Sequence, residues 1–178
     1  MTSIPALSVE VPSIDHVGIV VEDLADGMER FSQPLGLGPW NVYAYEPPTL
    51  TETTYRGERV EFGMRLALAD AGDMYVELLE PTISPNVYED HLDAHGEGLH
   101  HVACLSFEDP AAVVEEFEAA GMGVVQSGFA HGANFWYLDT AEELNGVMLE
   151  TGDRGVRDAP LPSPDEVYPP DASVESIF

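Results

Sequence analysis

The chain has 178 residues and is 44% hydrophobic, which is enough apolar material for one ordinary domain or two small ones. It carries 33 acidic residues against 6 basic ones, all of them arginine, for a formal net charge of −27. Such a surface repels nucleic acid and anionic membranes. Because the chain also lacks a long apolar run and a signal-peptide pattern at its N-terminus, we expect a cytoplasmic protein with neither kind of partner.

The excess of acidic residues also indicates a salt-rich cytoplasm. Repulsion among carboxylates destabilises a compact fold at low ionic strength, whereas at about 1 M salt the Debye length falls to roughly 3 Å and the repulsion is screened. An acidic protein from a low-salt cell would usually keep some lysines, and this chain has none. We therefore favour a halophilic protein over that alternative.

An internal repeat organises the chain. The segment IDHVGIVVEDLADGMERF at 14–31 aligns with LHHVACLSFEDPAAVVEEF at 99–117, and the alignment places His16 on His101. Each copy has the pattern of a β-branched strand followed by an amphipathic helix. A histidine at the same position of two copies indicates a shared purpose.

The neighbours of the matched histidines add detail. His100 takes the position of Asp15, and strand alternation predicts that it faces away from the matched histidine next to it. Two residues beyond each matched histidine stands a small side chain, Gly18 or Ala103, on the same face as the imidazole. We interpret these small residues as space for a cavity into which the ring points.

Strand-like segments follow each helix, RVEFGMRLAL and MYVELLEP in the first half and GVVQSG, NFWYLD and GVMLETG in the second. The sequence therefore predicts an α+β fold of two βαβββ modules, at 12–82 and 98–152. Between them, 83–97 has the composition of a linker with room for a short helix. Residues 1–11 form an N-terminal extension, and the acidic, proline-rich tail at 153–178 is expected to be an arm or a disordered end.

Each half ends on an apolar strand that carries one glutamate, Glu77 in YVELLE and Glu150 in VMLET. A carboxylate buried on such a strand is costly without a partner. Singly, these residues would more often be an edge glutamate or a core histidine, but matched positions in two copies favour a metal site. Two imidazoles and two carboxylates suit a divalent cation. The predicted ligands are His16, Glu77, His101 and Glu150.

These segments resemble the vicinal oxygen chelate superfamily of glyoxalases, bleomycin resistance proteins and dioxygenases, and within it most of all the methylmalonyl-CoA epimerases. IDHVGIVVEDL is similar to the opening strand of that family, VELLEP to its second ligand strand, GEGLHHVA to its His-His segment and GFAHGANFWYLDTAEELNGVMLE to its closing run. The likeness covers roughly residues 12–152. It implies that the paired modules curl a mixed sheet around a cavity in which the four predicted ligands hold Co, Zn, Mn, Ni or Mg.

In this superfamily a metal stabilises the enediolate that forms when a carbon-bound proton leaves. Epimerisation requires proton-transfer groups on both faces of that carbon. The resemblance implies the ligand Glu150 as one group and Glu61 as the other, with Glu58 as a competitor and a solvated surface acid as the alternative role of Glu61. His131 in FAHGAN and Trp136 in NFWYLD are candidates for substrate contacts.

The resemblance thus implies a metal-dependent epimerase or isomerase that acts on a small molecule such as an acyl-CoA, as a homodimer. Alternatives are a glyoxalase I-like lactoylthiol lyase, another small-molecule epimerase and a metal-free binding protein of the bleomycin-resistance kind. Glu77 is also what glyoxalase I carries, whereas LDTAEELNG lacks the Asp-Pro-x-Gly turn common there. A second carboxylate ligand disfavours a ring-opening dioxygenase. The phosphates of coenzyme A would find only six arginines in a repulsive field.

Overall fold

A computed structural model describes residues 7–153 and 162–172, which form one mixed eleven-stranded sheet and three helices. The first half holds β1 (His16–Val20), α1 (Leu24–Leu35), β2 (Trp40–Tyr45), β3 (Thr51–Tyr55), β4 (Glu58–Arg59), β5 (Gly63–Asp70) and β6 (Tyr75–Ile83). The connecting helix is α2 (Val87–His95). The second half holds β7 (Gly98–Ala103), α3 (Pro110–Ala119), β8 (Val124–Ala130), β9 (Ala133–Leu138) and β10 (Met148–Gly152), and β11 (Glu166–Tyr168) follows it.

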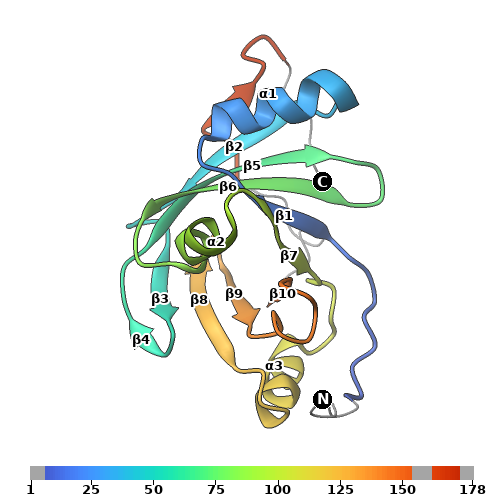
Figure 1. Ribbon diagram of the computed structural model, residues 1–178, viewed down its shortest axis with the longest axis vertical. Helices are drawn as coiled ribbons and strands as arrows, with labels where there is room; N and C mark the ends of the chain where they lie inside the picture. The colour runs from blue at the N-terminus through green and yellow to red at the C-terminus, as the bar shows by residue number, and fades with distance from the viewer. Residues whose placement is uncertain (1–6, 154–161, 173–178) are drawn as a thin grey trace.

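The two halves repeat one unit of a strand, a helix and three strands. The strand order is β11-β2-β5-β6-β1-β7-β10-β9-β8-β3-β4, so that β1-β6-β5-β2 in the first half corresponds to β7-β10-β9-β8 in the second. β1 pairs parallel with β6, β7 pairs parallel with β10, and β1 pairs antiparallel with β7 where the halves meet. The predicted α+β fold is confirmed, and Figure 1 shows the sheet curving, with the first half above and the second below.

Two helices cover the outer faces of the halves (Figure 1). α1 begins after Asp23, whose carboxylate caps the first turn, and it buries Leu24 and Met28 against the first-half strands. α3 begins after Asp109 in the same way and buries Phe117 against the second half. Within the described ranges, no helix is long and apolar enough to cross a membrane.

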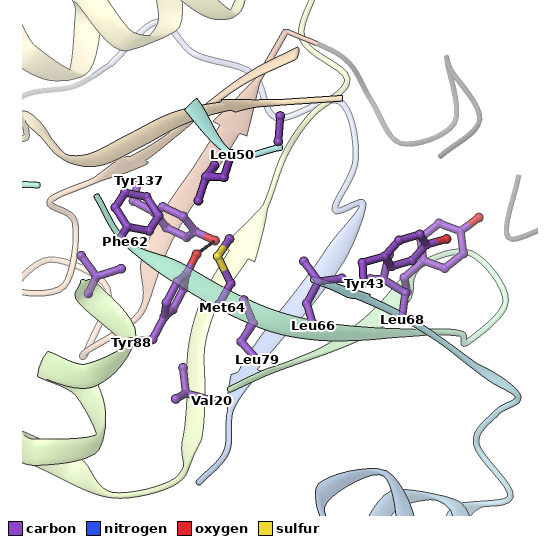
Figure 2. Packing of buried hydrophobic residues seen from close by; sticks show 13 residues of the cluster. Val20, Tyr43, Leu50, Phe62, Met64, Leu66, Leu68, Leu79, Tyr88 and Tyr137 are labelled. Atoms are coloured by element: carbon purple, nitrogen blue, oxygen red, sulfur yellow. Dashed lines mark hydrogen bonds between the residues drawn. The ribbon is translucent and has the colours of Figure 1, made fainter. Parts of the chain in front are cut away.

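The inner face of the sheet holds an apolar cluster of thirteen buried residues (Figure 2). Alternation along β5 turns Met64, Leu66 and Leu68 to this face. Tyr88 of α2 reaches into the cluster, and its hydroxyl donates a hydrogen bond of 3.1 Å to the hydroxyl of Tyr137 on β9. Burying an apolar side chain of this size contributes about 1.5–3 kcal/mol. The connecting helix is thus part of the core that surrounds the central strands.

The hairpin of β3 and β4 crosses from one half to the other. It lies between β2 and β5 in sequence, yet β3 pairs antiparallel with β8 of the second half. There the hydroxyls of Thr54 and Ser127 are 2.7 Å apart. The hairpin was not predicted, because its sequence TETTYRGER shows no apolar alternation and β8, its pairing partner, is far away in the chain. The strand β2 was not predicted either.

Part of the tail joins the sheet, as expected of an arm and not of a disordered end. β11 pairs antiparallel with β2 at the edge of the first half, and the carboxylate of Asp165 accepts the backbone amide of Ala44 at 2.9 Å. A strand this short forms because an existing edge satisfies its backbone hydrogen bonds, and periodicity does not reveal it. Outside the described residues lie 1–6 of the predicted extension and 154–161 and 173–178 of the predicted tail.

Candidate metal centre

Four adjacent strands in the middle of the sheet bring one polar side chain each to the same place. β6, β1, β7 and β10 carry Glu77, His16, His101 and Glu150. Gly18 of β1 lies opposite both Glu77 and His101, so the register itself brings the strands' polar positions together. The four residues are at most 8% exposed, and one donor atom from each lies within 4.8 Å of the others. The structure therefore brings together all four predicted ligands.

The donor atoms are spaced like ligands of one ion. The Nε2 atom of His16 lies 3.2 Å from Nε2 of His101, 3.1 Å from Oε2 of Glu150 and 3.4 Å from Oε2 of Glu77. The Nε2 atom of His101 lies 3.0 Å from Oε2 of Glu150 and 3.3 Å from Oε2 of Glu77. Adjacent ligands with metal bonds of about 2.1 Å stand roughly 3.0 Å apart in octahedral and roughly 3.4 Å apart in tetrahedral coordination.

The charges of this group require two positive charges nearby. Burial alone would lower the pKa of His16, but Glu77 and Glu150 outweigh it and raise the pKa to about 10. They raise the pKa of His101 against the same effect of burial. Burial would raise the pKa values of both carboxyls, and the two imidazoles lower them instead. Either two protonated imidazoles or one divalent cation with neutral imidazoles balances the site.

The residues present fit the metal that the resemblance implies. The Oε2 atom of Glu77 is buried and makes no hydrogen bond of normal geometry within the described residues, although the two Nε2 atoms lie 3.3 and 3.4 Å away. Buried carboxylate oxygens normally have a partner, and a cation provides one. Two imidazole nitrogens favour a borderline transition metal over Mg²⁺, which prefers oxygen ligands.

His100 departs from the sequence prediction. Gly18 pairs with His101 but Ile19 pairs with Leu99, so His100 is the extra residue of a β-bulge. Its ring lies on the same side as the ring of His101, with the two Nδ1 atoms 2.9 Å apart. The prediction that His100 faces away is wrong, because alternation holds only where strands pair without an inserted residue.

Gly18 also has a different role from the predicted one. A Cβ atom at this position would stand 1.8 Å from Cε1 of His101. The sequence predicts a cavity for the ring of His16 beside Gly18, but the imidazole of the neighbouring strand fills this space. A side chain here would displace a ligand.

Tyr137 is a neighbour of the site, and the segment NFWYLD offers it beside Trp136 as an aromatic residue that lines the cavity or is plain core. It pairs with Glu150 across β9 and β10, and its ring packs edge-on against that of His101 with centroids 5.0 Å apart. Trp136 precedes it on the same strand and so faces the other side of the sheet. The contact of Trp136 with a substrate stays a prediction. Its neighbour Tyr137 packs against the ligand His101, a choice between the two that needed the register of β9.

The sequence analysis did not single out Tyr45 of β2. Burial raises its pKa, and the negative charges of Glu77 and Glu150 raise it further. The ring of His131, in the exposed turn between β8 and β9, lies 5.0 Å from the ring of Tyr45. The contact of His131 with a substrate stays a prediction.

The predicted second proton-transfer group is not among the converging donors of the described chain. Glu61 is exposed just after β4, where it borders a cavity of about 480 Å³ together with Arg59. Its competitor Glu58 is exposed on β4. The catalytic roles of Glu61 and Glu150 stay predictions.

Comparison with known proteins places this arrangement in a family. Residues 15–138 match the glyoxalase/bleomycin resistance protein/dioxygenase superfamily. The chain belongs to this superfamily. The uncharacterized protein YqjC of Bacillus subtilis (strain 168) resembles this superfamily member with 26% identity over 147 residues, which cover 77% of this chain and 89% of that protein.

Solved structures with the same fold include methylmalonyl-CoA epimerases. The enzyme from Mycobacterium tuberculosis superposes with a TM-score of 0.56 and 21% identity, covering 89% of this chain and 96% of that chain. A variant of the Streptomyces coelicolor enzyme in complex with 2-nitronate-propionyl-CoA has a TM-score of 0.56 and 25% identity, covering 80% of this chain and 94% of that chain. This superfamily member therefore shares its fold with epimerases that act on acyl-CoA.

Proposed function

We propose that this superfamily member is a metal-dependent epimerase or isomerase that removes a proton next to a carbonyl, in the manner of methylmalonyl-CoA epimerases. The observation that supports it is the buried convergence of two imidazoles and two carboxylates between the duplicated halves. A binding protein that works without metal gains nothing from two buried carboxylates, which are costly to desolvate. The four-donor set therefore favours an enzyme over a metal-free binding module.

The residues divide the work as follows in this proposal. His16, Glu77, His101 and Glu150 hold a divalent metal, which when bound supplies Lewis acidity toward substrate oxygens. Glu150 is also the carboxylate that accepts the proton from carbon, since a ligand carboxylate that loosens from the metal is free to act as a base. Tyr137 and the apolar cluster limit the access of water to the inner face.

Inversion at carbon needs a second group, and we assign it to Glu61. Its exposure lets it exchange its proton with solvent, and Arg59 on the same cavity is a cation for an anionic substrate. Glu61→Gln should stop proton exchange from one methylmalonyl-CoA epimer while exchange from the other continues. Glu58→Gln is the matched control and should leave both unchanged. If both epimers still exchange their proton in Glu61→Gln, Glu61 has no part in the mechanism.

The direct test of the reaction is solvent-deuterium incorporation into methylmalonyl-CoA, with Co²⁺, Mn²⁺, Zn²⁺ or Ni²⁺ added to the metal-free chain. We expect incorporation with at least one metal, and in Glu150→Gln we expect loss of exchange from the epimer whose proton Glu150 removes. A hemithioacetal substrate should be assayed beside it, because Glu77 also fits glyoxalase I-like isomerisation. No exchange with any metal would reject the epimerase.

We further propose that the protein works in a salt-rich cytoplasm, given its net charge of −27. We also propose that it is a homodimer, as the resemblance implies. The melting temperature should rise steeply between about 0.1 M and 1 M NaCl, where the Debye length falls from roughly 10 Å to roughly 3 Å. Light scattering in the same buffers measures the oligomeric state. A melting temperature that does not change with salt would contradict the halophilic assignment.

A further inference from the structure

The hairpin of β3 and β4 has no counterpart in the second half of the described chain. β2 and β5 correspond to β8 and β9 in the repeated unit, but residues 46–62 connect the first pair and only 131–132 connect the second. The added segment is held in place at two points, because β3 pairs with β8 and Arg56 at the turn forms an ion pair of 2.9 Å with Asp90 of α2. It is therefore a fixed platform that the first half carries alone.

This platform contains the cavity of about 480 Å³ that borders Glu61, a volume suited to a small molecule. Pro47, Pro48 and Leu50 give it apolar wall, and Arg59 is the single cation among its lining residues. Two glutamates line it as well, so the cavity is not a site for a highly charged anion. One anionic group has one partner here.

Arg59 differs from the other arginines of the described chain. Arg30, Arg56 and Arg65 each form an ion pair with a carboxylate, at 2.6, 2.9 and 3.4 Å. Arg59 forms none within the described residues, although the chain has 33 acidic residues and two of them line the same cavity. Its guanidinium is therefore available to an anion of a ligand, which the planar fork binds with two hydrogen bonds.

We propose that Arg59 determines substrate specificity by binding a carboxylate of the acyl group close to the reacting carbon. This proposal rests on the proposed function, in which Glu61 exchanges a proton with that carbon. Arg59 and Glu61 are two residues apart and line one cavity, so their Cα atoms are at most about 7 Å apart. An anion on Arg59 therefore belongs to the part of the substrate next to the reacting carbon, whereas the phosphates of coenzyme A lie beyond the whole pantetheine arm.

Those phosphates have no comparable partner in the part of the chain that the structure describes. The other described arginines already hold carboxylates, and the net charge of −27 repels a polyanion. The site thus selects thioesters of dicarboxylic acids by their free carboxylate and does not read the nucleotide part of the carrier. A pantetheine thioester, which has no phosphate, serves as well as the coenzyme A thioester.

Equilibrium dialysis of labelled methylmalonyl-CoA and methylmalonyl-pantetheine against the Co²⁺-loaded chain tests this proposal, at about 1 M NaCl, where charge repulsion is screened. Wild type should bind both thioesters with similar affinity. Arg59→Gln should weaken the binding of both about tenfold or more, the size expected for hydrogen bonds to a charged group. Arg59→Lys, which keeps the charge, should recover part of the loss. Arg65→Gln removes an arginine held by Glu80 and Glu166, and as the matched control it should change neither affinity.

The pair of thioesters distinguishes the two sources of the anion. If Arg59→Gln weakens only the coenzyme A thioester, Arg59 holds a phosphate and the proposal is overturned, as it is if neither thioester is weakened. A wild-type preference for the coenzyme A thioester of more than about tenfold would overturn it too. Propionyl-pantetheine, which lacks the carboxylate, should bind wild type and Arg59→Gln equally, and unequal binding would mean that the substitution distorts the site.

Solvent-deuterium exchange with the same two thioesters tests the proposed function separately. A chain that binds both thioesters through Arg59 but exchanges neither would keep the specificity role and reject the epimerase. A chain that exchanges both while Arg59→Gln binds them unchanged would keep the epimerase and reject the role of Arg59.

Discussion

The strands β1 and β7 carry matched ligands but support them differently. His16 lies in regular pairing, and its Nδ1 atom is buried without a hydrogen-bond partner in the described chain. His101 follows a bulge, packs over Gly18 and shares a hydrogen with His100. A bond at the far nitrogen usually fixes the orientation of a ligand imidazole. The halves thus repeat the donor atoms, while only the second half orients its histidine by a hydrogen bond.

The residues that precede the two ligands show the same divergence. The carboxylate of Asp15 accepts the backbone amide of Leu105 at 2.8 Å and the hydroxyl of Ser106 at 3.0 Å. It therefore ties β1 to the chain after β7 and leaves the ligand alone. His100, at the aligned position, contacts the ligand itself.

The largest expected contrast separates the two glutamates. In Glu150→Gln we expect turnover to fall about 10³-fold, because the base is lost while the amide oxygen can still coordinate metal. In Glu77→Gln, whose amide oxygen can also coordinate metal, we expect a loss below about tenfold. Steady-state assays with metal content measured for each variant compare the two. Equal losses would show that neither glutamate is the base.

The packing of His101 over Gly18 is the next contrast. Gly18→Ala should weaken metal binding about 100-fold, at the upper end of second-shell effects, since its Cβ would stand 1.8 Å from the ligand ring. The matched variant is Ala103→Gly, two residues after His101 on β7 as Gly18 is two residues after His16 on β1. It should cost about 0.5–1 kcal/mol of stability and leave metal affinity unchanged. Metal titration and thermal unfolding measure both effects. A fully metallated Gly18→Ala protein would contradict the observed packing.

A smaller contrast tests the residues that precede the ligands. His100→Phe should weaken metal binding about tenfold, because the hydrogen bond that orients His101 is lost. Asp15→Asn should lower the melting temperature without a change in metal affinity, because its carboxylate accepts from Ser13, Leu105 and Ser106 and does not contact the ligand. If both variants weaken metal binding equally, the second half has no special support.

The smallest expected effect is the pH dependence of the metal-free chain. The pKa of His16 is raised from 6.5 to about 10, so its stabilising contribution is complete below pH 6.5 and is lost toward pH 10. Glu77 and Glu150 have pKa values lowered from 4.5, so their contribution is present above pH 4.5 and lost below it. Unfolding curves should show the group at its most stabilising between these limits. Calorimetry near neutral pH should detect about two protons released per metal bound.

Much of the candidate site follows from the sequence, because each ligand in one copy of the repeat can be checked against the residue at the aligned position of the other copy. His16 and His101 align in two copies of one strand, and each half closes on a strand with a single glutamate. Periodicity also predicts α1 and α3, because a helix is stabilised by residues close in sequence. These features needed no knowledge of the three-dimensional arrangement.

The supporting residues did not follow from the sequence. The side that His100 faces depends on one inserted residue in the pairing of β1 with β7, and the contact of Tyr137 depends on the register of β9. The crossing of β3 to β8 and the pairing of β11 with β2 join segments far apart in the chain. Backbone hydrogen bonds between strands carry almost no side-chain pattern that could reveal them.

The sequence by itself determined which four residues can hold a cation and that two similar units contribute them, because donor chemistry and repetition are properties of the chain. Only the tertiary structure decided that the donors lie 3.0–3.4 Å apart, that Gly18 makes room for His101, and that His100 contacts His101 from a β-bulge. The physical reason is that strand register and bulges arise from pairing across long loops, which local residue preferences do not specify.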